Sequence, residues 1–164
     1  MVTDTGVRSV AHATFTIERF YDAPPERVFR AFADPAVKAR WFAGPDNWGP
    51  EEREMDFRVG GREISRGGPK GGPVHVFDAR YWDIVPGRRI VFSYDMHLDG
   101  KRISVSLATV EMHPHDGGTR LWFTEQAAFL DGLDSVVERE RGTHGLLDAL
   151  GAELDRQAEE GTDA

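Results

Sequence analysis

Glu125 and Arg139 are the two residues of this chain that most suggest a chemical site. Glu125 follows Leu121 and Phe123 at every second position. If those two side chains face the core of a sheet, the Glu125 carboxylate faces it as well. A buried carboxylate needs a cationic partner, and we expect Arg139 to supply it. A buried carboxylate of this kind can act as an acid or base with a raised pKa; the alternative is a carboxylate at the edge or rim, in water.

A long amphipathic helix is expected to carry Arg139. The segment from Val136 to Leu154 repeats apolar residues at helical spacing, and Thr143 and Leu146 lie on the same face as Arg139. This face needs a surface to cover. Arg139 then either reaches the rim with its charged end or provides a polar anchor inside a mostly apolar pocket.

Small residues form a second face of this helix, with Gly142, Gly145, Ala149 and Ala152 adjacent to one another. Glycine inside a helix costs about 1 kcal/mol relative to alanine, so two glycines on one face require a reason. Three remain open: close packing on the sheet, room for a cavity, or contact with a second subunit.

The elements before this helix are mostly strands. Almost everything between Glu52 and Phe129 alternates between polar and apolar residues or forms turns. The turns are Gly60-Gly61, Pro86-Gly87, Asp99-Gly100 and Asp116-Gly117-Gly118. Short turns between adjacent strands predict an antiparallel sheet. An earlier strand near Phe15–Glu18 is followed by a helix start at Asp22–Glu26 and a helix break at Asp34-Pro35.

Composition excludes several classes of function. The chain has 164 residues, a formal net charge of −8 and no cysteine, so it suits one domain, disfavours nucleic acid as a partner and provides no thiolate chemistry. The chain has no run of about 20 apolar residues, the length that a membrane-spanning helix needs. Its start also lacks the features of a signal peptide. The histidines form no metal pattern. We therefore expect a cytoplasmic protein with no metal and no cofactor.

Several sequence blocks resemble proteins similar to the C-terminal domain of the activator of Hsp90 ATPase, a branch of the START-like (SRPBCC, Bet v 1-like) superfamily. The resemblance covers about residues 13–157, with its blocks in the expected order. The blocks are Phe20–Phe29, Asp34-Pro35, Arg40-Trp41-Phe42, Gly118–Leu121, Thr124-Glu125-Gln126, Phe129–Gly132 and Arg141-Gly142-Thr143. One departure is the pair Gly145-Leu146, where many relatives have Gly-Trp.

The resemblance implies an α+β helix-grip fold. Its seven-stranded antiparallel sheet wraps around a long C-terminal helix, and two short helices follow the first strand. A single domain would span residues 13–158, with flexible termini at residues 1–12 and 159–164. The fold also implies a cavity for an apolar or amphipathic small molecule, with the region of Trp41, Phe42 and Trp48 bordering its mouth.

Three functions remain open, since fold does not determine function. The first is binding of an apolar or amphipathic small molecule. The second is an enzyme similar to polyketide cyclases and aromatases, and the third is an interaction domain like the Hsp90 activator. A homodimer is an expectation from relatives. The predicted ligand-binding residues are Trp41, Phe42, Trp48, Glu125, Arg139, Thr143 and Leu146.

Overall fold

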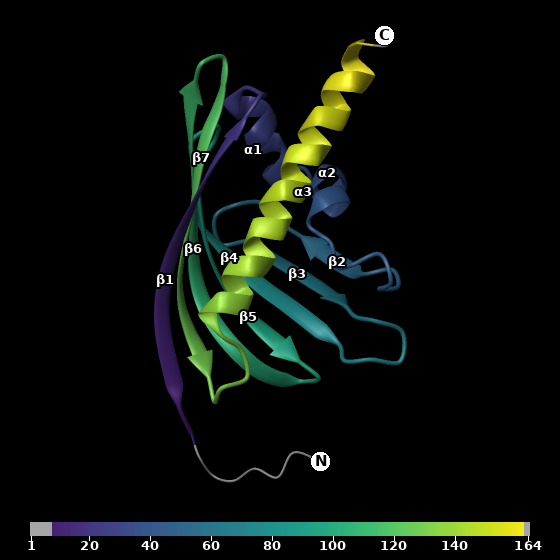
Figure 1. The fold of residues 1–164 in the computed structure, drawn as a ribbon, viewed down its shortest axis with the longest axis vertical. Helices are drawn as coiled ribbons and strands as arrows, with labels where there is room; N and C mark the ends of the chain where they lie inside the picture. Colours follow the sequence, from purple (N-terminus) through teal and green to yellow (C-terminus); the bar gives the residue numbers. More distant parts are fainter. Residues whose placement is uncertain (1–7, 163–164) are drawn as a thin grey trace.

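The computed structural model describes residues 8–162 and confirms the predicted α+β helix-grip architecture (Figure 1). The strands are β1 (Val10–Tyr21), β2 (Glu52–Met55), β3 (Arg62–Gly67), β4 (His75–Val85), β5 (Arg89–Leu98), β6 (Lys101–His115) and β7 (Gly118–Leu130). The helices are α1 (Pro25–Ala33), α2 (Pro35–Trp41) and α3 (Val136–Thr162). The strands form one antiparallel sheet in the order β1-β7-β6-β5-β4-β3-β2.

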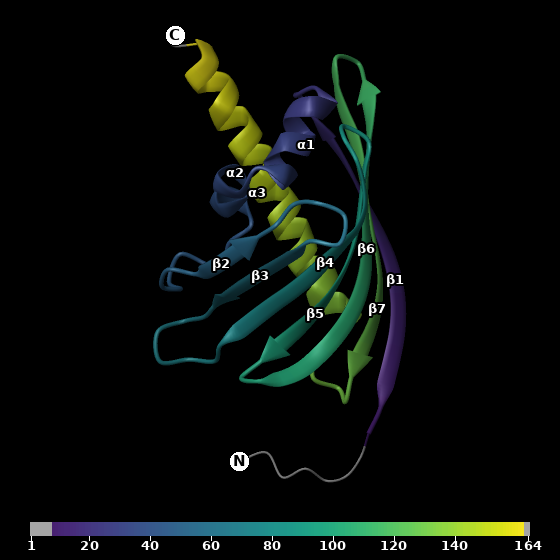
Figure 2. The ribbon, with the colours of Figure 1, turned by 180° about the vertical axis from the view of Figure 1, so that it is seen from behind.

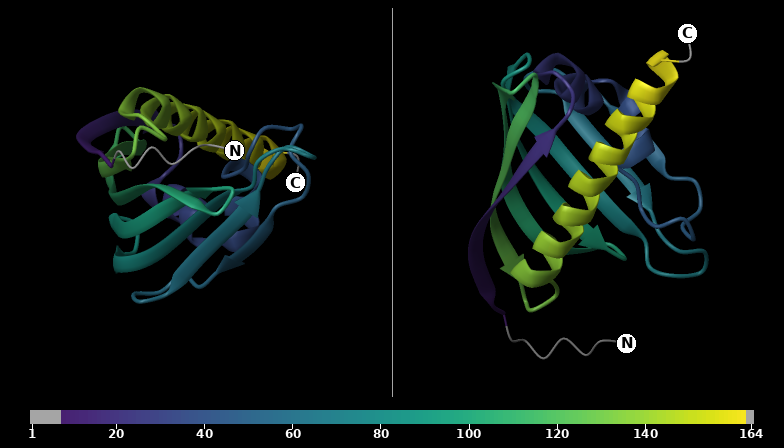
Figure 3. Two further views of the ribbon diagram at one scale, coloured as in Figure 1. Left: turned by 90° about the horizontal axis from the view of Figure 1, so that it is seen from below. Right: turned by 45° about the horizontal axis from the view of Figure 1, so that its top comes forward.

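The sheet is curved, and α3 runs along its concave side. Figure 3 shows this most clearly from below, where the sheet bends around the space under the helix. The two short helices lie between α3 and the upper end of the sheet, as Figures 1 and 2 show from opposite sides. Leu147, Leu150 and Leu154 of α3 are buried in the same core as residues of β1, β6 and β7. The leucine face therefore covers the sheet as its spacing predicts.

Proline and aspartate set the junction of α1 and α2. Pro25 occupies the first turn of α1, and Asp34 ends that helix in an extended conformation. The Asp34 carboxylate then accepts a hydrogen bond from the backbone N–H of Ala36 at 2.9 Å, which caps α2. At the end of α2, the Trp41 indole N–H donates to the carbonyl of Ala31 in α1 at 2.9 Å. This bond fixes the position of Trp41.

The regular elements extend further than the predicted domain. β1 begins at Val10 and α3 ends at Thr162, so residues 10–12 lie in a strand and residues 159–162 in a helix. Residues 10–12 pair with the end of β7, which explains their order. Residues 1–7 and 163–164 of the predicted termini lie outside the described residues.

Gly142 and Gly145, on the small-residue face of α3, make no close contact with other parts of the structure. A Cβ built on Gly142 or Gly145 would have no heavy atom within 4 Å. Close packing on the sheet is thus the wrong interpretation for these two positions, because each faces open space. A different glycine, Gly151, approaches the Tyr21 ring, where an added Cβ would lie 3.2 Å from the ring. Among the helices of the described part of the chain, none is long and apolar enough to cross a membrane.

An ionic cluster joins α2 to α3. Glu153 is 5 % exposed. Its carboxylate accepts hydrogen bonds from Arg156 Nε, which lies 3.1 Å from each oxygen, and from Arg40 of α2 at 3.4 Å. The hydrogen bond from Arg156 is the largest cause that lowers the pKa of Glu153 below its ordinary value of 4.5, and Arg40 adds to it.

We expect Glu153→Gln to lower stability at neutral pH but not in acid. Because the folded pKa is depressed, the stabilising effect of Glu153 is present above pH 4.5 and is lost as pH falls through the folded value. Urea unfolding at several pH values should show the difference between wild type and variant shrinking in acid. Glu52→Gln, at an exposed position, is the control. A difference that stays constant with pH would contradict this role.

Candidate functional site

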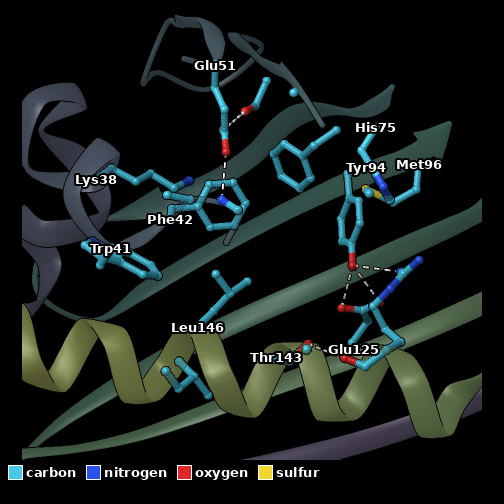
Figure 4. A pocket seen from close by; sticks show the side chains of 18 of the residues that line it. Lys38, Trp41, Phe42, Glu51, His75, Tyr94, Met96, Glu125, Thr143 and Leu146 are labelled. Atoms are coloured by element: carbon cyan, nitrogen blue, oxygen red, sulfur yellow. Dashed lines mark hydrogen bonds and ion pairs between the residues drawn. The ribbon is translucent and has the colours of Figure 1, made fainter. Parts of the chain in front are cut away.

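A pocket of about 360 Å³ lies between α3 and the concave face of the sheet. This volume is within the range of small-molecule sites, about 300–1,000 Å³. All seven residues predicted to bind a ligand are in its lining: Trp41, Phe42, Trp48, Glu125, Arg139, Thr143 and Leu146. Figure 4 shows Thr143 and Leu146 rising from α3 into the pocket, with Trp41 toward one end and Glu125 toward the other. The structure thus brings the seven residues together, and their contact with a ligand stays a prediction.

Glu125 lies at the polar end of the pocket and is fully buried. The predicted contact with Arg139 is confirmed, since Nη1 of the arginine lies 3.0 Å from Oε2 of Glu125. The Tyr94 hydroxyl from β5 lies 2.8 Å from both carboxylate oxygens, and the Ser106 hydroxyl from β6 donates to Oε2 at 2.8 Å. The alternative of a rim carboxylate in water is therefore wrong. Four side chains from three strands and one helix converge here.

Arg139 is held on several sides. Its Nη2 donates to the Ser104 hydroxyl at 2.6 Å and to the Asp134 carboxylate at 2.9 Å, while Nη1 also donates to the Tyr94 hydroxyl at 2.9 Å. Ser104 and Ser106 are buried on one face of β6. The guanidinium is therefore an internal anchor rather than a group that reaches into solvent.

Burial and charge fix the protonation of this cluster. Burial raises the pKa of Tyr94 well above its ordinary value, and the neighbouring Glu125 carboxylate adds to the effect. The hydroxyl therefore keeps its proton at neutral pH and acts as a hydrogen-bond donor. For Arg139, burial acts against the charge, but Tyr94, Glu125 and Asp134 outweigh it and raise the pKa of the guanidinium. It stays cationic.

A second buried ion pair lies toward the other end of the pocket. Lys38 of α2 and Glu63 of β3 are 5 % and 3 % exposed, and the Lys38 ammonium lies 2.6 Å from Oε1 of Glu63. The Tyr81 hydroxyl donates to the same oxygen. The ammonium also sits 4.7 Å from the centre of the Phe42 ring, a cation–π contact. Lys38 lines the pocket, but its charge is already neutralised.

Aromatic rings make most of the wall between these two ends. Phe42 packs edge-on against Trp41 at 5.9 Å and against Phe77 of β4 at 5.0 Å between ring centres. Trp48 stacks on His75 at 4.6 Å. The loop allows this because a Cβ on Gly44 would lie 2.1 Å from the Trp48 ring, so only glycine fits. The three predicted aromatic residues therefore line the pocket from α2 and the loop after it.

Thr143 and Leu146 complete the floor formed by α3. The Thr143 hydroxyl donates to the Arg139 carbonyl at 2.9 Å, one turn earlier in the same helix. Gly142 also lines the pocket, and a side chain there would meet no neighbour. Of the three reasons left open for the small face, room for a cavity therefore fits Gly142. Within residues 8–162, no group of three metal-ligating side chains is close enough to hold a metal ion.

Reasoning from the sequence missed Tyr94, Asp134 and Lys38. Tyr94 has the same strand parity as Phe92, which by itself predicts a core position and no polar role. Asp134 precedes the last helix, where an acidic residue is an ordinary helix-start signal. A lysine three positions before Trp41 on the buried face of a short helix was the available signal for Lys38.

Comparison with known proteins agrees with this fold. The family model described as activator of Hsp90 ATPase homolog 1-like protein matches residues 22–156. An uncharacterized protein from Rhizobium leguminosarum is 45% identical, with a TM-score of 0.87 over 92% of this chain and 99% of its own. A protein from Rhizobium loti is 55% identical, with a TM-score of 0.83 over 88% of this chain and 99% of its own.

A more distant structure supports the fold alone. The AHSA1-like protein from Aeromonas hydrophila is 22% identical, with a TM-score of 0.70 over 89% of this chain and 94% of its own. A search of curated proteins finds no match to this chain. The family match covers most of the sequence, and two solved relatives exceed 40% identity over nearly their whole length. The chain therefore belongs to the family of activator of Hsp90 ATPase homolog 1-like proteins.

Proposed function

We propose that this protein binds an apolar or amphipathic small molecule in the pocket between α3 and the sheet. The observation that carries the proposal is the pocket of about 360 Å³, with aromatic walls and the buried cluster of Glu125 and Arg139 at one end. Ligand sites commonly combine a large apolar surface with a few fixed polar groups. The apolar part of the ligand would lie along Phe42, Phe77 and Leu146, with its polar part near Arg139.

Leu146→Trp is expected to block the pocket. Leu146 lies in the floor, so a larger ring there occupies the space that a ligand needs. The neutral fluorescent probe N-phenyl-1-naphthylamine should bind the wild type, and the variant should bind it at least about tenfold more weakly, or about 1.4 kcal/mol. Fluorescence titration measures both. Filling open space should cost less stability than inserting a ring into a packed core, about 1–3 kcal/mol, so the variant should still unfold cooperatively.

Val137→Trp is the matched control, because Val137 is on the same helix but 60 % exposed. It should bind the probe like the wild type. Two results would contradict the proposed function: no binding of the probe by the wild type, or equal weakening of binding by both tryptophan variants.

An enzyme similar to polyketide cyclases is a second candidate, favoured by the convergence of Tyr94, Glu125 and Arg139 on one end of the pocket. Cyclases act largely by shaping a reactive chain, with a few polar groups steering protons. The protonated Tyr94 hydroxyl is the proton donor in such a scheme. Mass spectrometry of a ligand recovered before and after long incubation with the protein distinguishes the two candidates. A binding protein returns the ligand unchanged, whereas an enzyme returns a product. The Hsp90-type interaction and the homodimer stay predictions.

A further inference from the structure

The polar end of the pocket has more carboxylates than cations. Among the described residues that line it are Glu125, Asp134, Glu138 and Arg139. The guanidinium of Arg139 is bound by both Glu125, at 3.0 Å, and Asp134, at 2.9 Å. Glu138 pairs with Arg141 at 2.8 Å, and both of these side chains are largely exposed. Three carboxylates therefore face two cations, which leaves one excess negative charge here.

An anionic ligand would find no vacant cation at this end. The two terminal nitrogens of Arg139 already donate to oxygens of Tyr94, Ser104, Glu125 and Asp134. A ligand carboxylate would have to displace a protein carboxylate from the guanidinium, and would then be repelled by it. Binding an anion at this end is thus unfavourable although an arginine is present.

The helix N-terminus does not reverse this preference. The start of α3 would by itself attract an anion. However, the Asp134 side chain accepts from the backbone N–H of Ser135 at 2.8 Å, and the Ser135 hydroxyl accepts from that of Glu138 at 3.3 Å. Protein oxygens therefore occupy the anion position, and one of them belongs to a carboxylate.

The other end of the pocket also offers no free cation among the described residues. Lys38 is matched by Glu63 at 2.6 Å, and Arg53 by Glu51 at 2.7 Å. Between the two ends, the walls are aromatic rings, whose faces attract cations. Phe42 already makes such a contact with the Lys38 ammonium. Both the polar end and the walls thus favour positive over negative charge.

We propose that the pocket selects amphipathic molecules whose polar end is a cationic amine, accepts a neutral hydroxyl less tightly, and rejects carboxylates. The inference rests on the proposed function. An ammonium group placed at the polar end gains the free acceptor positions of Asp134 and Glu138 and neutralises the excess charge. A ligand hydroxyl gains a hydrogen bond but does not neutralise the excess charge. A ligand carboxylate gains neither the hydrogen bond nor the neutralisation.

A matched series of ligands tests the inference at neutral pH and low salt. Decylamine, 1-decanol and decanoate share one chain and differ only in the polar end. Each is titrated against the protein loaded with N-phenyl-1-naphthylamine, and displacement is followed by fluorescence. Decylamine should bind at least about tenfold tighter than decanoate, or about 1.4 kcal/mol, with 1-decanol between them.

Two variants locate the preference in the pocket. Asp134→Asn keeps an acceptor for the N–H of Ser135 and removes one charge; it should reduce the ratio of amine to carboxylate affinity by at least about threefold, or about 0.7 kcal/mol. Glu138→Gln is an exposed substitution that spares folding and should shift the ratio in the same direction by less. Asp116→Asn changes the net charge equally on the β6–β7 turn, remote from the pocket lining, and should leave the ratio unchanged.

The outcomes separate the inference from the proposed function. Decanoate binding as tightly as decylamine overturns the charge selectivity but supports small-molecule binding. A preference that Asp116→Asn reduces as much as Asp134→Asn does would come from the net charge of −8, and this result also overturns the inference. If none of the three compounds displaces the probe, and Leu146→Trp does not weaken binding of the probe, the proposal of small-molecule binding itself is wrong.

Discussion

Arg139→Met is expected to reduce the free energy of unfolding by about 3–5 kcal/mol, the usual cost of breaking a buried ion pair. The substitution leaves Glu125, which has no exposed surface, without a cationic partner. Tyr94 and Ser106 still donate to its carboxylate, but neutral donors compensate a buried charge only in part. For a chain of this size, the loss corresponds to a fall in melting temperature of roughly 6–20 °C.

Urea denaturation of three variants checks this result. Arg141→Met, two positions along the same helix but 70% exposed at its side chain, is the control and should change stability by no more than about 0.5 kcal/mol. Adding Glu125→Gln to Arg139→Met should recover part of the loss, because the unpaired charge is then gone. If the double variant is less stable than Arg139→Met alone, the penalty does not come from the uncompensated carboxylate.

Lys38→Met should cost about 3 kcal/mol or more for the same reason at the other buried pair. Glu63 is 3 % exposed and would keep only the hydrogen bond from Tyr81. Methionine fills a similar volume, so the loss of charge rather than a cavity dominates. Because Lys38 lines the pocket and joins α2 to β3, the loosened contact should also weaken binding of the fluorescent probe.

Thermal and urea unfolding measure this change, with Lys101→Met as the control at the exposed first position of β6. The control should remain within about 0.5 kcal/mol of the wild type. The double variant Lys38→Met with Glu63→Gln should be more stable than Lys38→Met alone. If Lys38→Met lowers the free energy of unfolding no more than Lys101→Met does, the Lys38–Glu63 pair contributes little to stability.

The alternation of β7 made one part of the site predictable. Leu121, Phe123 and Glu125 share a parity, and all three are buried in the structure. A strand has a side-chain period of two, so the neighbouring apolar residues fix the direction of the carboxylate. The face of α3 that holds Arg139 followed from helical spacing in the same way. Local geometry was therefore sufficient to bring these two charges together.

The same rule fails in β3. Ile64 would be expected to face the core, but Glu63 and Ser65 are the buried residues and Ile64 is only half-buried. The reversal occurs because Lys38 of α2 and Tyr81 of β4 provide partners for the Glu63 carboxylate. A buried charge is tolerated only where such partners exist, and they come from segments distant in the sequence.

The sequence by itself determined the elements, the family and the inward-facing sides of β7 and α3, since these depend on periodicity and local turn chemistry. Only the tertiary structure decided which further carboxylate binds Arg139 and which one neutralises Lys38. Arg139 meets Asp134 and Glu125 together, and Lys38 meets Glu63; both pairings depend on the curvature of the sheet and the placement of α2. The charge that a pocket presents to a ligand is what remains after such pairing, and pairing is a long-range property of the folded chain.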